Sequence, residues 1–435
     1  MRLNQFQRTM LQWSGVHPYH AVHVLKAAAP LSRERFQERL NLVLEQCGLA
    51  FVTIDEARGC CAYAGGNPRC PVREIAGQGD PAAALEEEIV RQLNEPIAGG
   101  EGGGPFTPFR FFLMNEGGES YLGIAYFHAV ADAEAIRRLL GAMARAAFAE
   151  EMPPLADESL RPLRGSRMPT GSFFHFLPRT RAALRRFQAM RRSIRPPLCG
   201  ENEFRNAYFG ISFDGDQTRT VLERAKSWGL TVNDLCLAAL LKAVSKCAAE
   251  VPRRHAHRSL LSIGCVVNGR RDLPEKRRRD FGLFLGSFAV TEDVPASLTV
   301  RSLAERVCAR TLAVKQHKLY LAAPLEFMVS RYMFGRMPLE KKRNFYRKSY
   351  PLWGAITNMT NMNLGELGGS PDAPPFVDYF RAVSAGPAMP LVIGVTGVEG
   401  RLNFGISYRP NVLPEAEVRG IAARFTAFLT GEEEA

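Results

Sequence analysis

The sequence predicts a mixed α/β protein made of two halves of similar composition. The chain has 435 residues, of which 46% are hydrophobic and 23% charged, so it can support more than one hydrophobic core. Strand-like and helix-like apolar patterns alternate in both halves. A segment rich in proline and arginine separates them. We therefore expect domains at residues 1–160 and 201–435, joined by a basic linker at 161–200.

The first half predicts a strand, a helix, a hairpin and a second helix. Residues 19–26 are typical of a strand, and residues 32–46 carry apolar side chains at helical spacing after a serine. Two β-rich runs, at 109–114 and 121–127, flank a turn with two glycines. From Asp132 onward the apolar period becomes helical.

The second half repeats the alternation of strands and helices. The expected elements are a strand at 207–213, a helix through 221–228, a helix opened by Thr231, strands at 260–268 and 284–291, and a helix at 300–315. A hairpin turning at Glu399 and Gly400 precedes a last helix at 414–429.

The predicted linker contains a basic amphipathic helix. From Arg161 to Arg195 the chain has ten arginines and no acidic residue, and residues 180–192 place apolar side chains along one side of a helix. Such a helix can contact a membrane surface or a partner protein. It can equally pack its apolar edge on its own domain, and the sequence leaves both interpretations open.

The charge is unevenly distributed. Residues 1–160 hold 14 Lys and Arg against 20 Asp and Glu, so the net charge of +12 comes from the rest of the chain. An acidic partner is expected there, such as the phosphates of a nucleotide-like cofactor, an acidic carrier protein or anionic lipid. Nucleic acid is not expected, because no basic element interleaved with aromatic residues is present. The sequence begins without the apolar core of a secretory signal and has no membrane-length apolar run, which predicts a cytoplasmic protein.

No metal site is expected from the cysteines or histidines. The nine cysteines form no regular framework, and Cys60, Cys61 and Cys70 have no second pair at ligand spacing. His20 and His23 fall in a predicted strand, where their spacing places them on opposite faces.

The most specific local signal is the segment YFHAVADA. His128 ends a predicted strand and Asp132 begins the following helix. Histidine can act as a general base near neutral pH, because its unperturbed pKa is about 6.5. Asp132 can also serve only as a helix cap, so spacing alone leaves catalysis and local structure as alternatives.

This segment resembles the HHxxxDG motif of the coenzyme A-dependent acyltransferase superfamily, which includes chloramphenicol acetyltransferase, condensation domains, wax ester synthases and polyketide-associated acyltransferases. His128 takes the position of the catalytic second histidine and Asp132 that of the structural aspartate. Phe127 replaces the first histidine and Ala133 replaces the glycine.

Three further segments resemble the same superfamily. Thr231–Val244 is similar to the TVND-type helix start of wax ester synthases, and Asp280–Phe284 is similar to the DFGWG segment of plant acyltransferases. Ile356–Leu367 looks like the Asn-rich region in which the chain crosses between the domains.

The resemblance implies two chloramphenicol acetyltransferase-like domains arranged in a V, with a tunnel between them and His128 at its middle. An acyl group would pass from acyl-coenzyme A or a phosphopantetheine carrier-protein thioester to an alcohol or amine, with no permanently bound cofactor. Thr357, Asn358 and Asn361 are the candidates for stabilising the oxyanion, and Asp280 and Gly282 are expected to be structural.

The basic residues offer two roles within this interpretation. Arg270, Arg271, Arg277 and Arg278 are predicted to bind the phosphates of the donor, and Arg270 or Arg271 is also a candidate partner for Asp132. Two other functions stay open, namely a carrier-protein-dependent enzyme that forms amides and a non-catalytic binding scaffold of the same fold.

Overall fold

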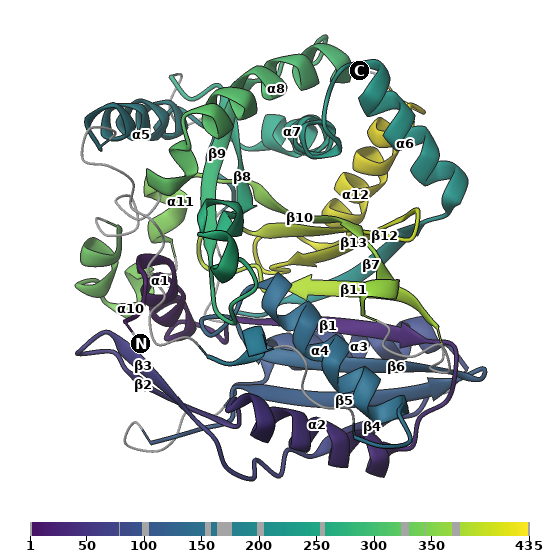
Figure 1. The fold of residues 1–435 in the computed structure, drawn as a ribbon. Helices are drawn as coiled ribbons and strands as arrows, with labels where there is room; N and C mark the ends of the chain where they lie inside the picture. Colours follow the sequence, from purple (N-terminus) through teal and green to yellow (C-terminus); the bar gives the residue numbers. More distant parts are fainter. Residues whose placement is uncertain are drawn as a thin grey trace.

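The computed structural model confirms the mixed α/β fold class. Each half of the chain is a sheet with helices, and the two halves lie one above the other (Figure 1). The structure describes residues 2–77, 79–97, 104–152, 158–162, 176–197, 204–252, 257–322, 330–342, 344–367 and 375–433.

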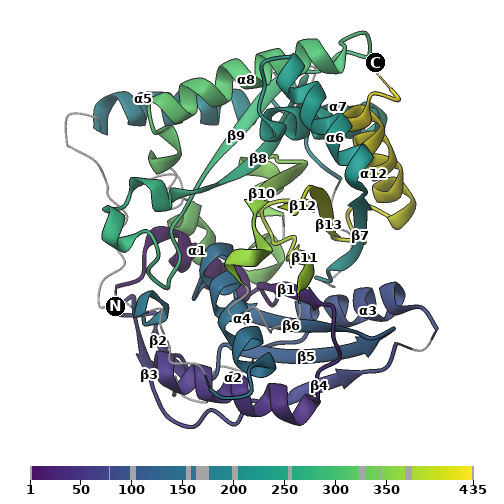
Figure 2. The ribbon, with the colours of Figure 1, turned by 45° about the vertical axis from the view of Figure 1, so that its right-hand side comes forward.

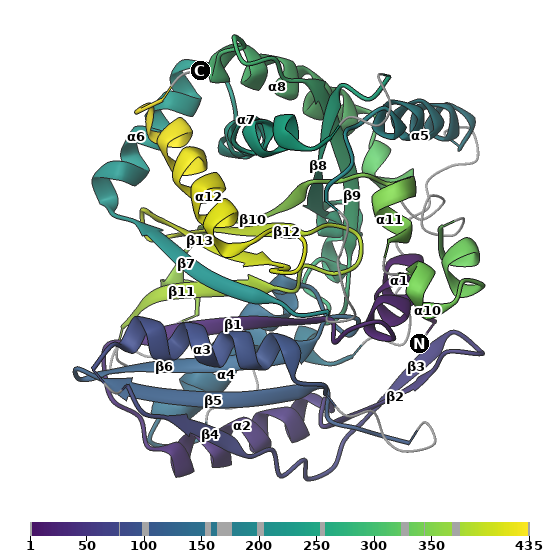
Figure 3. The same cartoon turned by 180° about the vertical axis from the view of Figure 1, so that it is seen from behind.

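The first sheet has five strands in the order β11-β1-β6-β5-β4. They are β1 (His20–Ala27), β4 (Val72–Ile75), β5 (Phe109–Glu116), β6 (Glu119–Phe127) and β11 (Phe376–Val383). Helices α2 (Arg33–Cys47) and α4 (Ala133–Phe148) share the hydrophobic core on one face. Helix α3 (Pro81–Asn94) covers the other face and lies in front in Figure 3. Strands β2 (Phe51–Asp55) and β3 (Cys60–Ala64) form a separate hairpin.

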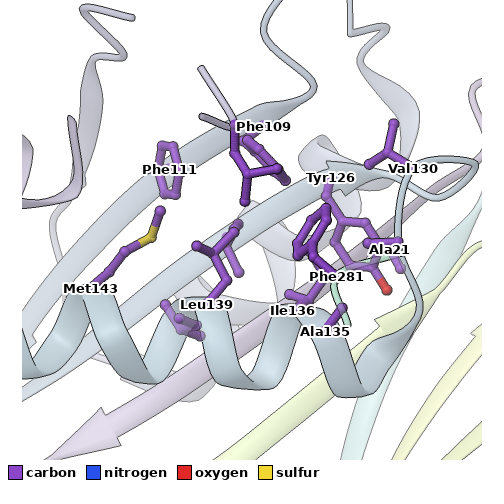
Figure 4. Packing of buried hydrophobic residues seen from close by; sticks show 14 of the residues in the cluster. Ala21, Phe109, Phe111, Tyr126, Val130, Ala135, Ile136, Leu139, Met143 and Phe281 are labelled. Carbon is purple, nitrogen blue, oxygen red and sulfur yellow. The ribbon is translucent and has the colours of Figure 1, made fainter. Parts of the chain in front are cut away.

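The packing of α4 on this sheet fixes the segment that carries the HxxxD motif. Ile136, Leu139 and Met143 lie about one helical turn apart on the buried side of α4, and Leu139 and Met143 face the rings of Phe109 and Phe111 (Figure 4). All five are buried, and burying each such side chain contributes roughly 1.5–3 kcal/mol to folding. The N-terminus of α4 is thereby held against the end of β6.

The second sheet has six strands in the order β7-β13-β12-β10-β8-β9. They are β7 (Ala207–Phe213), β8 (Leu260–Asn268), β9 (Leu285–Asp293), β10 (Gly354–Met362), β12 (Leu391–Val398) and β13 (Arg401–Tyr408). Four helices on its outer side share one core with it (Figure 2): α6 (Gly215–Ser227), α7 (Val232–Glu250), α8 (Val300–Gln316) and α12 (Glu415–Thr430).

Strand β11 comes from the C-terminal half but belongs to the first sheet. It runs antiparallel to β1, with Arg381 opposite His23, and as the edge strand of the first sheet it lies next to the second sheet (Figure 1). A Cβ atom at Gly405 of β13 would lie 1.9 Å from the Arg381 carbonyl oxygen, so glycine is what permits this close crossing. The boundary predicted at residue 201 therefore does not separate the two sheets.

The chain crosses between the two sheets later than the sequence predicted. Residues 356–362 lie inside β10, in the second sheet, and the chain returns to the first sheet only with β11. Strand β10 was not predicted, because its asparagines and threonines are typical of polar turns.

The remaining helices lie on the side of the molecule where α1 is found. They are α1 (Gln5–Ser14), α5 (Phe176–Arg191), α10 (Leu339–Lys342) and α11 (Phe345–Ser349). Short 3₁₀ turns are η2 (Glu158–Leu160), η4 (Gly269–Asp272), η5 (Glu275–Arg277), η6 (Leu319–Ala322) and η7 (Leu364–Glu366).

Helix α5 corresponds to the basic amphipathic helix expected at 180–192. Met190 is buried, and the ring of Phe187 lies 5.1 Å from that of Tyr350. The C-terminal part of this helix thus packs against its own protein, which is one of the two alternatives that the sequence left open. No helix in the described part of the chain has both the length and the apolar character needed to cross a bilayer.

Candidate active site

His128 follows directly after the last residue of β6 and is almost completely buried. Its backbone N–H donates to the Tyr19 carbonyl oxygen at 3.2 Å, which extends the pairing of β6 with the segment before β1. Its ring stacks on that of Tyr19, with centroids 5.7 Å apart, and meets the Tyr126 ring edge-on at 5.5 Å. The imidazole is therefore held in one orientation.

The hydrogen bond of the imidazole defines which nitrogen is basic. Nδ1 lies 3.3 Å from the Ala131 carbonyl oxygen, and because a carbonyl only accepts, Nδ1 carries the proton. This leaves the lone pair on Nε2, for which no hydrogen-bond partner exists among the described residues. Burial lowers the pKa of His128, so the ring is neutral at neutral pH.

Asp132 faces away from this nitrogen and holds the loop in place. Its Oδ1 accepts from the Ala135 N–H at 3.0 Å as the N-cap of α4, and its Oδ2 accepts from the Phe284 N–H at 2.9 Å. Arg270 Nη2 donates to Oδ1 at 2.7 Å. The carboxylate thus joins the start of α4 to a loop of the second half.

The hydrogen-bond donors of Arg270 are all occupied by groups of the protein itself. It is 3% exposed, and all five of its N–H groups are engaged, by Asp132 and by the carbonyl oxygens of Arg278, Asp280 and Gly282. Of its two predicted roles, the structure shows the pairing with Asp132 and removes Arg270 from the phosphate-binding residues, because no donor remains for a phosphate.

A cavity of about 150 Å³ lies between the two halves at His128. Its walls come from α1, β8, β9, β10, β11, β12 and α11 as well as from the end of β6, and they are mainly apolar. Ala133, which stands at the position of the motif glycine, lines this cavity, whereas Phe127 does not. Thr357 lines it from β10, on the opposite half from His128.

Comparison with solved structures identifies this architecture. The first condensation domain of the CDA synthetase has a TM-score of 0.65 and 16% identity, with 99% of this chain and 94% of that chain covered. The chain has the condensation-domain fold. The cyclization-docking bidomain of EpoB from Sorangium cellulosum has a TM-score of 0.66 and 12% identity, with coverage of 99% and 84%. Polyketide synthase associated protein 5 from Mycobacterium tuberculosis has a TM-score of 0.62 and 12% identity, with 98% of each chain covered.

These similarities confirm the predicted pair of chloramphenicol acetyltransferase-like domains across the whole chain. No family model and no curated protein sequence matches the chain. At identities of 12–16% the likeness shows the condensation-domain fold alone.

The other predicted site residues lie in three places. Asp280 pairs with Arg277 at 3.1 Å, and Gly282, at φ +152°, accepts the Asp132 N–H at its carbonyl oxygen, so both support the loop. Arg271 and Arg278 are exposed on the loop between β8 and β9. The Asn358 Oδ1 is buried and has no hydrogen-bond partner in the described part of the chain, and Asn358 is not part of the cavity wall. Asn361 lies in β10, and its side chain is outside the described residues.

Three residues at the cavity were not singled out from the sequence. Tyr19 and Tyr126 contact the ring of His128, and Arg381 reaches the cavity from β11. The alternation of β6 places Tyr126 on the core side, a signal available in the sequence. Arg381 carried no such signal, because its position depends on the strand crossing. Among the described residues no cluster of histidine, cysteine or acidic side chains suits a metal ion.

Proposed function

We propose that this protein transfers an acyl group from a thioester to the hydroxyl or amine of an acceptor, with His128 as general base. The observation that carries the proposal is the Nε2 of His128, which has no protein partner among the described residues and belongs to the wall of the apolar cavity. Nε2 takes the acceptor proton as the oxygen or nitrogen attacks the thioester carbon. The C–S bond then breaks, and the proton passes to the departing thiolate.

The opposite half supplies a donor for the oxyanion. Thr357 lines the same cavity, and its hydroxyl has no hydrogen-bond partner within the described residues. A hydroxyl aimed at the developing charge in an apolar site stabilises the tetrahedral intermediate. Asp132 acts as a positioning residue, because its oxygens are occupied by Arg270 and by backbone N–H groups.

The donor is an acyl thioester of coenzyme A or of a carrier protein. Support comes from the exposed cations Arg271, Lys276, Arg278 and Arg279 on the loop between β8 and β9, which suit phosphates or an acidic protein. The similar structures include condensation domains of the CDA synthetase and of the Monacolin K polyketide synthase MokA, which favours testing the carrier-bound donor alongside the free one.

The test follows thiol release and product mass with acyl-coenzyme A and with acyl carrier protein, using a mixed panel of alcohols and amines. His128→Gln is expected to reduce the rate by a factor of about 100 or more while the circular dichroism spectrum stays unchanged. Thr357→Val should lower the rate, and Thr357→Ser should retain it. Full activity of His128→Gln would refute the base assignment, and absence of product with both donors would favour the binding scaffold.

A further inference from the structure

Arg381 is a buried cation without a counter-ion among the described residues. Its side chain projects from β11, and the residue is 2% exposed. Nε donates to the Thr396 hydroxyl at 2.9 Å, and Nη2 donates to the carbonyl oxygens of Val395 at 2.7 Å and Thr357 at 3.2 Å. All three acceptors are neutral, and within the described chain Nη1 donates to no protein atom.

A charge buried in this way is costly unless an anion accompanies it. The ionisable groups that act on Arg381 are Tyr379, Tyr126 and Tyr208, rather than carboxylates. Burial raises the pKa of each of these tyrosines, so they are neutral and cannot balance the guanidinium. The structure therefore contains a fixed positive charge whose partner is not a described residue.

This charge belongs to the wall of the cavity, together with a buried tyrosine. Arg381 and Tyr126 both line the cavity that contains His128. The Tyr126 hydroxyl is buried and has no hydrogen-bond partner among the described residues, although its ring contacts that of His128. A guanidinium N–H and a hydroxyl, both unsatisfied and both beside an otherwise apolar space, suit the two oxygens of a carboxylate.

We propose that Arg381 and Tyr126 form a carboxylate subsite, so that the preferred acceptor bears a carboxylate near its attacking hydroxyl or amine. This inference rests on the proposed acyl transfer, because the role of the subsite in the reaction depends on it. The acceptor is the favoured source because the subsite adjoins His128, which must receive the acceptor proton. The carboxylate neutralises the field of Arg381 and thereby makes His128 more basic when acceptor is bound.

The first experiment measures binding without an acyl donor. Calorimetric titration of the full chain with 2-hydroxyhexanoate is expected to give at least tenfold tighter binding than titration with 2-hydroxyhexanamide. Tyr126→Phe removes only a hydroxyl that has no hydrogen-bond partner among the described residues, so it should keep the fold and weaken carboxylate binding several-fold. Arg381→Met should abolish the preference for the acid, whereas Arg219→Met, which removes an exposed cation on α6, should leave it unchanged.

The second experiment measures turnover and separates the two sources of carboxylate. Wild type with butyryl-coenzyme A or its carrier-bound equivalent should favour the hydroxy acid over the amide at least tenfold in kcat/KM. A preference for succinyl-coenzyme A over butyryl-coenzyme A, with no acceptor preference, would overturn the acceptor assignment. Equal binding of acid and amide by wild type would overturn the subsite itself, whether or not acyl transfer occurs. Tight, Arg381-dependent binding of the acid without turnover would support the subsite while refuting the proposed reaction.

Discussion

The buried ion pair between Arg270 and Asp132 connects the two halves, and we expect its loss to lower the free energy of unfolding strongly. Asp132 is 2% exposed, and the substitution Arg270→Met would leave its charge with two backbone N–H donors as its remaining partners among the described residues. Breaking a buried pair from one side costs about 3–5 kcal/mol, because the remaining charge is uncompensated. The same substitution removes the Arg270 donor from the carbonyl oxygens of Arg278, Asp280 and Gly282, of which Gly282 keeps the Asp132 N–H.

The assay is urea unfolding at pH 7, followed by circular dichroism and by tryptophan fluorescence. Arg270→Met should lower the free energy of unfolding by about 3–5 kcal/mol, and Asp132→Asn should also be strongly destabilising, because it leaves Arg270 buried without an anion. The double variant should lose less than the sum of the two, since neither charge is then left alone.

Arg219→Met is the control for an exposed ion pair. Arg219 pairs with Asp216 on α6, and their side chains are 64% and 85% exposed, so its removal should cost no more than about 1 kcal/mol. A loss below about 1 kcal/mol for Arg270→Met, or additive losses in the double variant, would refute the role assigned to the buried pair.

Three further predictions concern stability. In the same urea unfolding assay, Gly405→Ala should destabilise the protein by about 1–3 kcal/mol or more, because its Cβ would lie 1.9 Å from a backbone oxygen. Gly394→Ala is the control and should have a mild effect, because the backbone oxygen nearest to a Cβ there lies at 3.7 Å. Thr231→Ala should cost about 1 kcal/mol by removing the N-cap of α7, and Thr231→Ser should restore it; equal urea midpoints would contradict the capping role. Burial lowers the pKa of His17 to about 4 and of His20 to about 3. As the pH falls, these histidines therefore bind protons in the unfolded chain before they do so in the folded protein, and the melting temperature should fall as pH decreases below 6.5. His20→Gln should make that dependence shallower, and an unchanged slope would contradict the assignment.

Elements with their own periodic signal could be predicted from the sequence. The helices opened by Asp132 and Thr231 begin where a capping side chain precedes an apolar period, and both caps are present. The hairpin of β12 and β13 turns at Glu399 and Gly400, both with positive φ, as its turn signal indicated. These features depend on neighbours in the chain, which a local pattern contains.

Features that depend on contacts across the fold could not be predicted in the same way. Nothing in the local sequence of β11 tells which sheet it joins, so the position of the crossing was assigned too early in the chain. Arg270 and Arg271 are adjacent and chemically alike, and only the 3₁₀ turn at 269–272 buries one and exposes the other. Arg381 gains its place beside the cavity through the same strand crossing.

The geometry also separates the two departures of the motif from the family pattern. Phe127 is the last residue of β6, where side chains alternate between faces, and it packs near Phe106 and His20 rather than on the cavity. The aromatic ring at the position of the first motif histidine therefore lies outside the wall of the cavity. Ala133 does line the cavity, so its methyl group narrows the space beside His128. Phe127 therefore does not alter the surroundings of the proposed base, whereas Ala133 limits the size of the groups that can reach it.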